Sequence, residues 1–233
     1  MEEKKFEKSF FEEWSKDYDK RRNKSFLEKS KQHMTSIIDR HIGDNSDFLE
    51  IGLGTGEVFE LLSSRFKFSC GTDISEGMVR RTYSKEKVKK ELFVGDACNL
   101  PLKSNSFDFV VCQDVLEHVP YQEKLILEIC RVLKKDGVGI ITTPNPLWAP
   151  ILYFAEKLGL KVKEGEHKFI FLPSMVKKSL KKSSCVVINT RSFMMIPLKS
   201  NLDRFFESLS NKKNFSKLGF SQMCVIKKLN HHE

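Results

Sequence analysis

The 233-residue sequence lacks long apolar runs, internal repeats and low-complexity segments. Its longest apolar stretch, from Leu147 to Ala155, is much shorter than the roughly 20 residues that a membrane-spanning helix requires. The first residues are acidic and basic rather than apolar. We therefore expect a cytoplasmic protein without a transmembrane segment. The length fits one α/β domain with additions, whereas two full domains would be cramped.

The six cysteines also lack a pattern. They lie far apart in the chain and form no C-x-x-C pair, and Cys112 and Cys130 lie inside apolar segments. Such spacing is typical of separate buried thiols in a reducing compartment, and it agrees with a cytoplasmic location.

Positive charge is in excess but is not concentrated. Forty Lys and Arg residues against 31 Asp and Glu residues give a formal net charge of +9. The lysines occur in short groups mixed with acids, which favours an ordinary solvated surface over a nucleic-acid interface. A nucleic-acid partner is therefore not favoured, although the net charge keeps it as an alternative.

The clearest feature that is present is a glycine-rich stretch from Phe48 to Val58. An apolar run that includes an acid, followed by Gly52, Gly54 and Gly56, predicts a strand, a tight turn and a helix start. Glycine tolerates positive φ and has no Cβ, so such a loop can approach a ligand closely. Dinucleotide-binding loops place the third glycine one residue later and bind a phosphate at the helix start, where Glu57 would repel it. The spacing therefore disfavours a nicotinamide dinucleotide.

A repeating strand–helix rhythm follows this loop. Four apolar strands are predicted, and each ends at an acid. The strands cover Phe48–Ile51, Lys67–Thr72, Glu91–Val94 and Phe107–Cys112, and the acids are Glu50, Asp73, Asp96 and Asp114. The carboxyl ends of parallel strands share one edge of a sheet, where open α/β sheets bind their ligands. We therefore expect the four acids on one rim.

The rest of the chain continues the α/β pattern. Apolar periodicity and turn signals predict further helices at Glu57–Phe66, Gln122–Lys135, Pro173–Lys182 and Asn201–Leu209. They predict further strands at Val138–Thr142, Cys185–Thr190 and Phe220–Lys228. Ser75 is expected to cap the helix after the second strand. We expect a single domain over residues 1–233, with a helical cap at 1–42, a cofactor-binding core at 48–145, an aromatic substrate lid at 147–172 and a C-terminal half at 173–233.

Several linked motifs between residues 48 and 145 resemble one family. Besides the glycine loop they are Gly71-Thr72-Asp73-Ile74-Ser75 with Met78, Gly95-Asp96-Ala97-Cys98-Asn99-Leu100-Pro101, Ser106 to Val111, Val115-Leu116-Glu117-His118, and Arg131 to Gly137. In order and spacing they are similar to class I S-adenosylmethionine-dependent methyltransferases of the ubiquinone-biosynthesis (UbiE/UbiG-like) type. The resemblance implies a doubly wound, mostly parallel seven-stranded sheet. It also implies methyl transfer to a small-molecule acceptor by in-line displacement at the sulfonium methyl.

The resemblance also implies roles for individual residues. Asp73 would accept both ribose hydroxyls, and Asp96 would accept from the adenine amine beside the Ala97 N–H. Ile74 and Met78 would sandwich the adenine ring. The alternatives are a helix-capping role for Asp73 and plain core packing for the two apolar side chains.

The remaining cofactor contacts would come from the glycine loop and two polar side chains. Gly52, Gly54 and Gly56 would approach the cofactor through their backbone, while Glu50 and Gln113 would hold the methionine ammonium and nearby water. Either side chain could instead cap local backbone groups.

His118 is the candidate catalytic residue, because an imidazole can accept the proton of a phenol or amine acceptor. A capping or packing role is the alternative. Asp114, Glu117 and His118 are spaced i, i+3 and i+4, so in a helix they would share one face and could hold a divalent cation, as in some ubiquinone-type O-methyltransferases. The shorter Asp114 makes the cation site the less favoured hypothesis.

Other functions remain as alternatives. An RNA, tRNA or protein methyltransferase fits the net charge, but amino-methylating nucleic-acid enzymes carry Asp-Pro-Pro-Tyr or Asn-Pro-Pro-Phe after the fourth strand, where this chain has Gln113-Asp114-Val115-Leu116. A non-catalytic adenosylmethionine-binding partner subunit is a third reading, opposed by the intact glycine loop and acid series. The sequence indicates neither a specific acceptor nor an oligomeric state.

Overall fold

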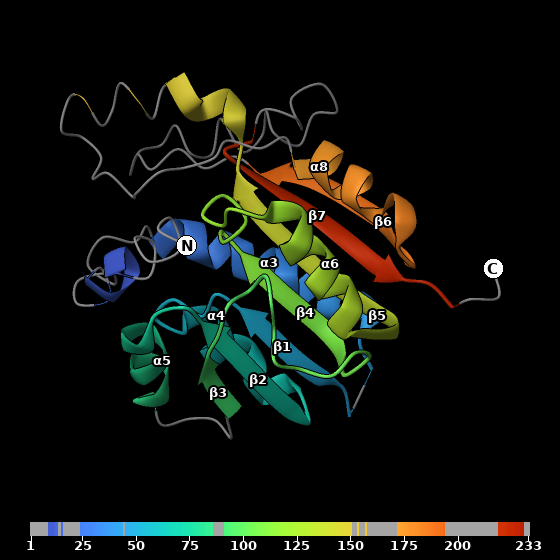
Figure 1. The fold of residues 1–233 in the computed structure, drawn as a ribbon, viewed down its shortest axis with the longest axis horizontal. Coiled ribbons are helices and arrows are strands. Elements are labelled where there is room, and N and C mark those ends of the chain that lie inside the picture. The colour runs from blue at the N-terminus through green and yellow to red at the C-terminus, as the bar shows by residue number, and fades with distance from the viewer. Residues whose placement is uncertain are drawn as a thin grey trace.

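The fold is built on one seven-stranded sheet. It is seen in a computed structural model that describes residues 9–13, 15, 24–43, 45–85, 91–150, 153, 157, 172–193 and 219–230. The strand order is β3-β2-β1-β4-β5-β7-β6, and among these described strands β7 alone runs opposite to the rest. The predicted doubly wound, mostly parallel sheet is therefore confirmed (Figure 1).

Strands and helices alternate along most of the chain. The strands are β1 Asp47–Ile51, β2 Phe68–Asp73, β3 Glu91–Val94, β4 Phe107–Gln113, β5 Leu133–Pro144, β6 Cys185–Phe193 and β7 Ser221–Lys228. The helices are α3 Lys24–His41, α4 Glu57–Leu62, α5 Glu76–Tyr83, α6 Gln122–Val132 and α8 Leu172–Ser179, with single 3₁₀ turns at η1 Ser63–Arg65, η2 Pro146–Trp148 and η3 Leu180–Lys182. Residues 9–13 are also helical.

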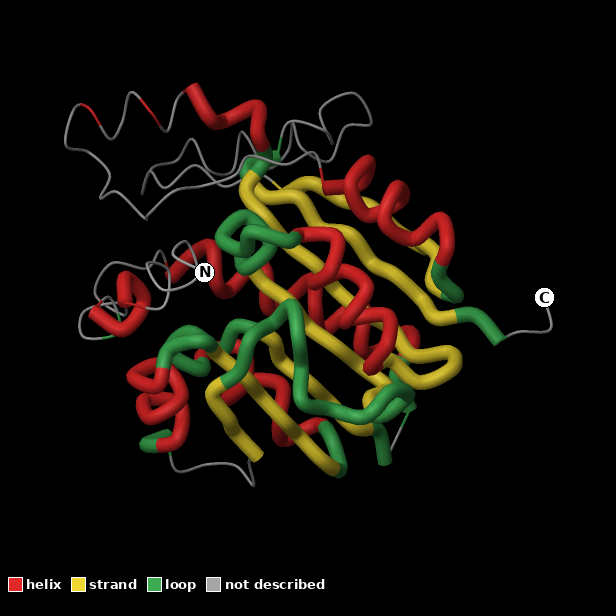
Figure 2. Tube along the Cα trace, in the orientation of Figure 1, coloured by secondary structure: helices red, strands yellow, loops and turns green. Residues whose placement is uncertain are grey.

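Helices cover both faces of the sheet (Figures 1 and 2). Successive strand residues point to opposite faces, so neighbours in β1 and β4 contribute to different cores. Phe48 and Phe109 pack with α3 and α4, whereas Leu49 and Val110 pack with α6 and α8. All four side chains are fully buried. Because both faces are buried, the central strands have apolar residues at adjacent positions and do not alternate strictly between apolar and polar residues.

The predicted helix Gln122–Lys135 is wrong at its end, because α6 stops three residues earlier and β5 begins at Leu133. The physical reason lies in Lys134. Its ammonium donates to the carboxylates of Asp47 at 2.6 Å and Asp108 at 2.8 Å, which ties the start of β5 to the starts of β1 and β4. A register shift between β4 and β5 accommodates the residues in between.

Two other predicted helices, Glu57–Phe66 and Pro173–Lys182, are α-helical only in their first part and finish in the 3₁₀ turns η1 and η3. The predicted helix Asn201–Leu209 lies outside the described residues, as do most of the cap at 1–42 before α3 and most of the lid at 147–172. Among the residues that are described, no helix is long and apolar enough to cross a membrane.

The order in which the chain adds strands to the sheet reverses between β1 and β4. From β1 the chain builds outward through β2 and β3, and it then returns to place β4 and β5 on the other side. Loops that leave β1 and β4 therefore diverge at this point and open a crevice at the carboxyl edge of the sheet.

Candidate functional site

A cleft lies at the carboxyl ends of β1 to β4. The structure brings together here most of the residues singled out from the sequence: Glu50, Gly52, Gly54, Asp73, Ile74, Met78, Asp96, Ala97, Gln113, Asp114 and His118. The expected meeting of the four strand-end acids on one rim is confirmed. Gly56 and Glu117 are buried but are not part of the lining.

Sequence reasoning missed several lining residues, including Phe11, Leu53, Thr72, Val58, Val115 and Val119. Thr72 directly precedes Asp73, so the strand end that pointed to the acid could have pointed to it as well. Phe11 gave no such signal, because its place in the cleft depends on how the N-terminal segment packs.

The glycine loop has the positive φ angles that the sequence predicts. Gly52, Gly54 and Gly56 have φ angles of 81°, 51° and 78°, which L-residues with a Cβ rarely adopt. A Cβ on Gly52 would lie 2.2 Å from Cγ2 of Val115, and one on Gly56 would lie 2.5 Å from Cγ2 of Thr82. A larger residue at Gly52 would therefore displace Val115 in the lining of the cleft, and one at Gly56 would press against Thr82 of α5.

Asp73 ties the glycine loop to the start of α5. Its Oδ2 accepts from the Gly54 N–H and its Oδ1 from the Ser75 N–H, both at 2.9 Å. Ser75 caps α5 as predicted, since its hydroxyl accepts from the Met78 N–H at 3.2 Å. Burial raises the pKa of the Asp73 carboxyl to about 6, even though the backbone hydrogen bonds act in the opposite direction.

This raised pKa makes stability depend on pH. The folded-state pKa lies above the unfolded value of 3.8, so the contribution of Asp73 to folding is fully present below about pH 4 and is lost as pH rises through about 6. We expect the difference in unfolding free energy between the wild type and Asp73→Asn to change by up to about 3 kcal/mol between pH 4 and 7. Urea denaturation at a series of pH values measures it. A difference that stays flat over this range would contradict the raised pKa.

Two buried polar atoms in the cleft have no hydrogen-bond partner within the described part of the chain. They are Oγ1 of Thr72 and Oε1 of Gln113, and the two residues are 1% and 6% exposed. An unsatisfied buried polar group costs about 1–3 kcal/mol, so such atoms indicate a place for a polar ligand. Nearby, Oδ1 of Asp96 accepts from the Cys98 N–H at 2.9 Å and shapes the turn after β3.

Residues 114–118 form a turn and not the helical face that the cation hypothesis requires. Asp114 has a φ of 54°, which reverses the chain immediately after β4. Oε2 of Glu117 accepts from Oγ1 of Thr143 at 3.0 Å, and the side chain is only 2% exposed. Within the described ranges no three His, Cys, Asp or Glu side chains are grouped closely enough to hold a metal ion.

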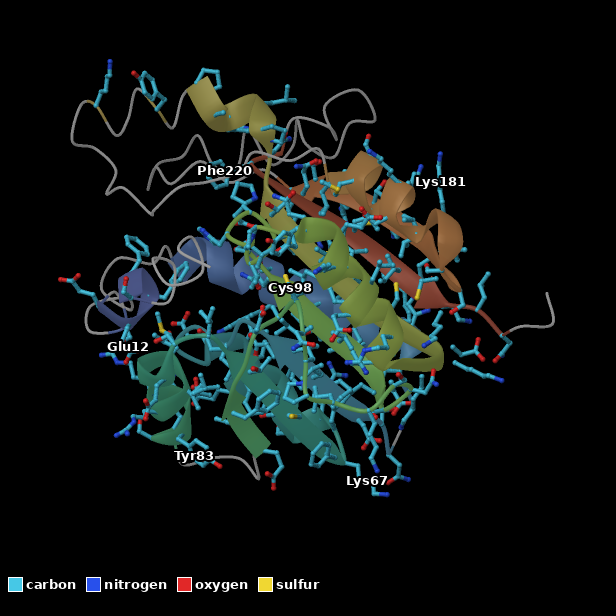
Figure 3. The ribbon with its side chains drawn as sticks, in the orientation of Figure 1. Glu12, Lys67, Tyr83, Cys98, Lys181 and Phe220 are labelled. Carbon is cyan, nitrogen blue, oxygen red and sulfur yellow. The ribbon has the colours of Figure 1, made fainter. Side chains whose placement is uncertain are left out.

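The N-terminal segment closes one side of the cleft. The ring of Phe11 meets the imidazole of His118 edge to face, with centroids 5.1 Å apart. Next to it, the Glu12 carboxylate accepts from the Ser75 hydroxyl at 2.8 Å and from the Gly77 N–H at 2.9 Å, which places Glu12 at the start of α5 (Figure 3). The segment thus connects α5 with the turn that carries His118.

The comparisons with known proteins agree with this geometry. A family model described as a methyltransferase domain matches residues 49–141. An uncharacterized protein of Methanocaldococcus jannaschii is 33% identical over 59% of this chain and 51% of its own length. Demethylmenaquinone methyltransferase of Staphylococcus haemolyticus is 31% identical over 65% of this chain and 66% of its own length. The chain spans about half the length of the first curated relatives that it matches.

Solved structures share the fold. One is a chain of the complex between the Haloferax volcanii Trm112 methyltransferase activator and a methyltransferase, with a TM-score of 0.67, 14% identity and coverage of 95% of this chain and 98% of that one. Another is an S-adenosylmethionine-dependent methyltransferase of Clostridium acetobutylicum, with a TM-score of 0.62, 15% identity and coverage of 86% and 91%. The family match assigns residues 49–141 to a methyltransferase domain, and the solved structures share its fold.

Proposed function

We propose that the protein transfers a methyl group from S-adenosylmethionine to a small-molecule acceptor, in the manner of the UbiE/UbiG-like branch. The observation that carries the proposal is the meeting of the glycine loop and four strand-end acids in one cleft. The similarity to a demethylmenaquinone methyltransferase supports the branch. We also propose that residues 1–233 act as one domain, with the cap at 1–42 and the segment 147–172 next to the acceptor.

The residues of the cleft fit this cofactor. It carries a sulfonium and an ammonium, which suit a rim of carboxylates, and it carries no phosphate, which suits the acid Glu57 at the start of α4. Its hydroxyl and amino groups can supply donors to the buried Oε1 of Gln113, which has no partner among the described residues. The polar Oγ1 of Thr72 is a further candidate contact.

The roles follow from the chemistry of each side chain. Asp73 would accept from the ribose hydroxyls, because its carboxylate keeps lone pairs beyond the two that the backbone N–H groups use. Asp96 and the Ala97 N–H would recognise the adenine, and Ile74 and Met78 would pack on its faces. Met78 is 1% exposed and already held in place by α5.

The other end of the cofactor would lie by the glycine loop. Glu50 and Gln113 would hold the ammonium, and Gly52, Gly54 and Gly56, which have no Cβ, would let the backbone approach the cofactor. When bound, S-adenosylmethionine supplies an electrophilic methyl group, so the chain mainly has to orient the acceptor and exclude water.

His118 would accept the acceptor's proton, since its imidazole lines the cleft and is packed against Phe11. We favour this role over a cation held by Asp114, Glu117 and His118. The reason is that the Glu117 carboxylate is buried behind the lining and accepts a hydrogen bond from Thr143.

A second candidate is a protein or RNA methyltransferase that works with a partner subunit. The solved complex that contains the Trm112 methyltransferase activator favours it, because one chain of that complex shares the fold over 95% of this protein. A non-catalytic subunit is disfavoured by the complete series of acids in the cleft.

Thermal unfolding tests the cofactor assignment. At a hundredfold excess over its dissociation constant, S-adenosylhomocysteine should stabilise the protein by about 2.7 kcal/mol. For a chain of 233 residues, this corresponds to a rise in melting temperature of roughly 5 to 10 °C. NAD at the same concentration is the control and should leave the melting temperature unchanged. A shift with NAD and none with S-adenosylhomocysteine would overturn the proposal.

A further inference from the structure

The turn that carries His118 is held by two consecutive threonines of β5. Thr142 and Thr143 are at most 1% exposed, and each uses its hydroxyl on an acid of the turn. Successive side chains of a strand point to opposite faces of the sheet. The two hydroxyls therefore bind the turn from opposite faces of β5. Neither threonine is among the residues that the cofactor roles require.

Thr142 holds the start of the turn. Its hydroxyl donates to Oδ1 of Asp114 at 2.9 Å, while the Asp114 N–H donates to the backbone oxygen and to Oγ1 of Thr142, both at 3.2 Å. These contacts fix a residue whose φ is 54°, a conformation that costs energy for a side chain with a Cβ. The direction in which the chain leaves β4 is therefore set by Thr142.

Thr143 holds the end of the turn. Its hydroxyl donates to Oε2 of Glu117 at 3.0 Å, and both groups are buried. Its own backbone oxygen accepts from the Ser221 hydroxyl at 3.4 Å, which anchors it to β7. Glu117 directly precedes His118, so the hydrogen bond that holds the Glu117 carboxylate also positions the backbone of His118.

The middle of the turn is anchored as well. Leu116 is fully buried, and Cγ2 of Val115 fills the space beside the Cα of Gly52 that a Cβ would need. The His118 N–H donates to the Val115 oxygen at 3.0 Å and closes the turn. The imidazole then reaches the cleft and the ring of Phe11.

We infer that Thr142 and Thr143 are positioning residues that hold His118 at its place in the cleft through Asp114 and Glu117. The inference rests on the proposed function, because it gives His118 the task of meeting the acceptor. Catalytic groups need such support, since a displacement of about 1 Å can reduce a rate about a hundredfold. Removal of the Thr143 hydroxyl would take away the hydrogen bond that ties the buried Glu117 carboxylate to β5, so the end of the turn would shift relative to the cleft.

The test follows the imidazole of His118 by NMR in protein with labelled histidines, and His118→Gln assigns its signal. Phe11→Leu removes the neighbouring ring and shows how far and in which direction that ring shifts the signal. We expect Thr143→Val to move the His118 signal in the direction seen with Phe11→Leu, and Thr143→Ser to restore it. The signal of His33, whose ring lies 5.2 Å from that of Phe193, should stay in place.

Ser69→Ala is the matched control. It also removes a buried hydroxyl, which donates to the Ser63 oxygen at 3.0 Å at the start of β2, far from the turn. An unmoved His118 signal in Thr143→Val, or equal shifts of all histidine signals in Thr143→Val and Ser69→Ala, would overturn the inference.

Calorimetric titration with S-adenosylhomocysteine separates this inference from the proposed function. If wild-type protein does not bind the ligand, the proposed function fails, whatever the NMR shows. If it binds, Thr143→Val should bind within about threefold of wild type, because the turn and not the cofactor cradle has moved. A loss of binding as large as that caused by Gly52→Ala in the glycine loop would contradict the positioning role.

Discussion

Asp73→Asn should bind S-adenosylmethionine about a hundredfold more weakly than the wild type. The substitution replaces a carboxylate that would accept two ribose hydroxyls by an amide with one acceptor oxygen, and charge-assisted hydrogen bonds of this kind together are worth about 3 kcal/mol. The amide would also point a donor at the Gly54 or Ser75 N–H, which the carboxylate satisfies in the wild type. Isothermal titration calorimetry at pH 7.5, well above the carboxyl pKa of about 6, measures the change.

The matched control is Asp136→Asn. Asp136 is likewise an aspartate with hydrogen bonds of its own, but it pairs with Lys227 at the opposite end of the sheet from the cleft. It should bind the cofactor as the wild type does. If Asp73→Asn also keeps the wild-type dissociation constant, Asp73 serves only to join the glycine loop to α5.

His118→Ala should lower turnover by about a hundredfold to ten-thousandfold while cofactor affinity stays nearly constant. The expected cause is loss of the group that accepts the acceptor's proton. A screen of phenols and amines with S-adenosylmethionine supplies the acceptor for the assay. High pH should partly restore turnover, because a phenol that ionises by itself no longer needs the base.

Chelation distinguishes the base from a bound cation. If His118 acts as a base, wild-type turnover should be the same with and without chelator. Activity that disappears with chelator and returns with magnesium, manganese or zinc would instead support a cation held by Asp114, Glu117 and His118. Wild-type turnover in His118→Ala, with chelator present, would exclude both roles and leave alignment of the reactants as the main contribution.

Much of the fold could be predicted from the sequence because it depends on local patterns. Apolar runs at Glu50 and before Asp73 mark parallel strands buried on both faces, and the short run before Asp96 marks the partly exposed edge strand β3. Parallel strands bring their carboxyl ends to one edge. The glycines at 52, 54 and 56 required positive φ, and Ser75 has the side chain of a helix cap. Each of these signals lies within a few residues of the feature that it predicts.

The sequence alone therefore determined the order of strands and helices, the glycine loop and the edge of the sheet where the acids meet. Only the tertiary structure decided how the turn after β4 is built. Its spacing suits a helix, but Asp114 and Glu117 instead bind the hydroxyls of Thr142 and Thr143, which follow them by 28 and 26 residues. Such contacts between distant segments satisfy buried carboxylates only after the sheet has formed, and no local pattern records them.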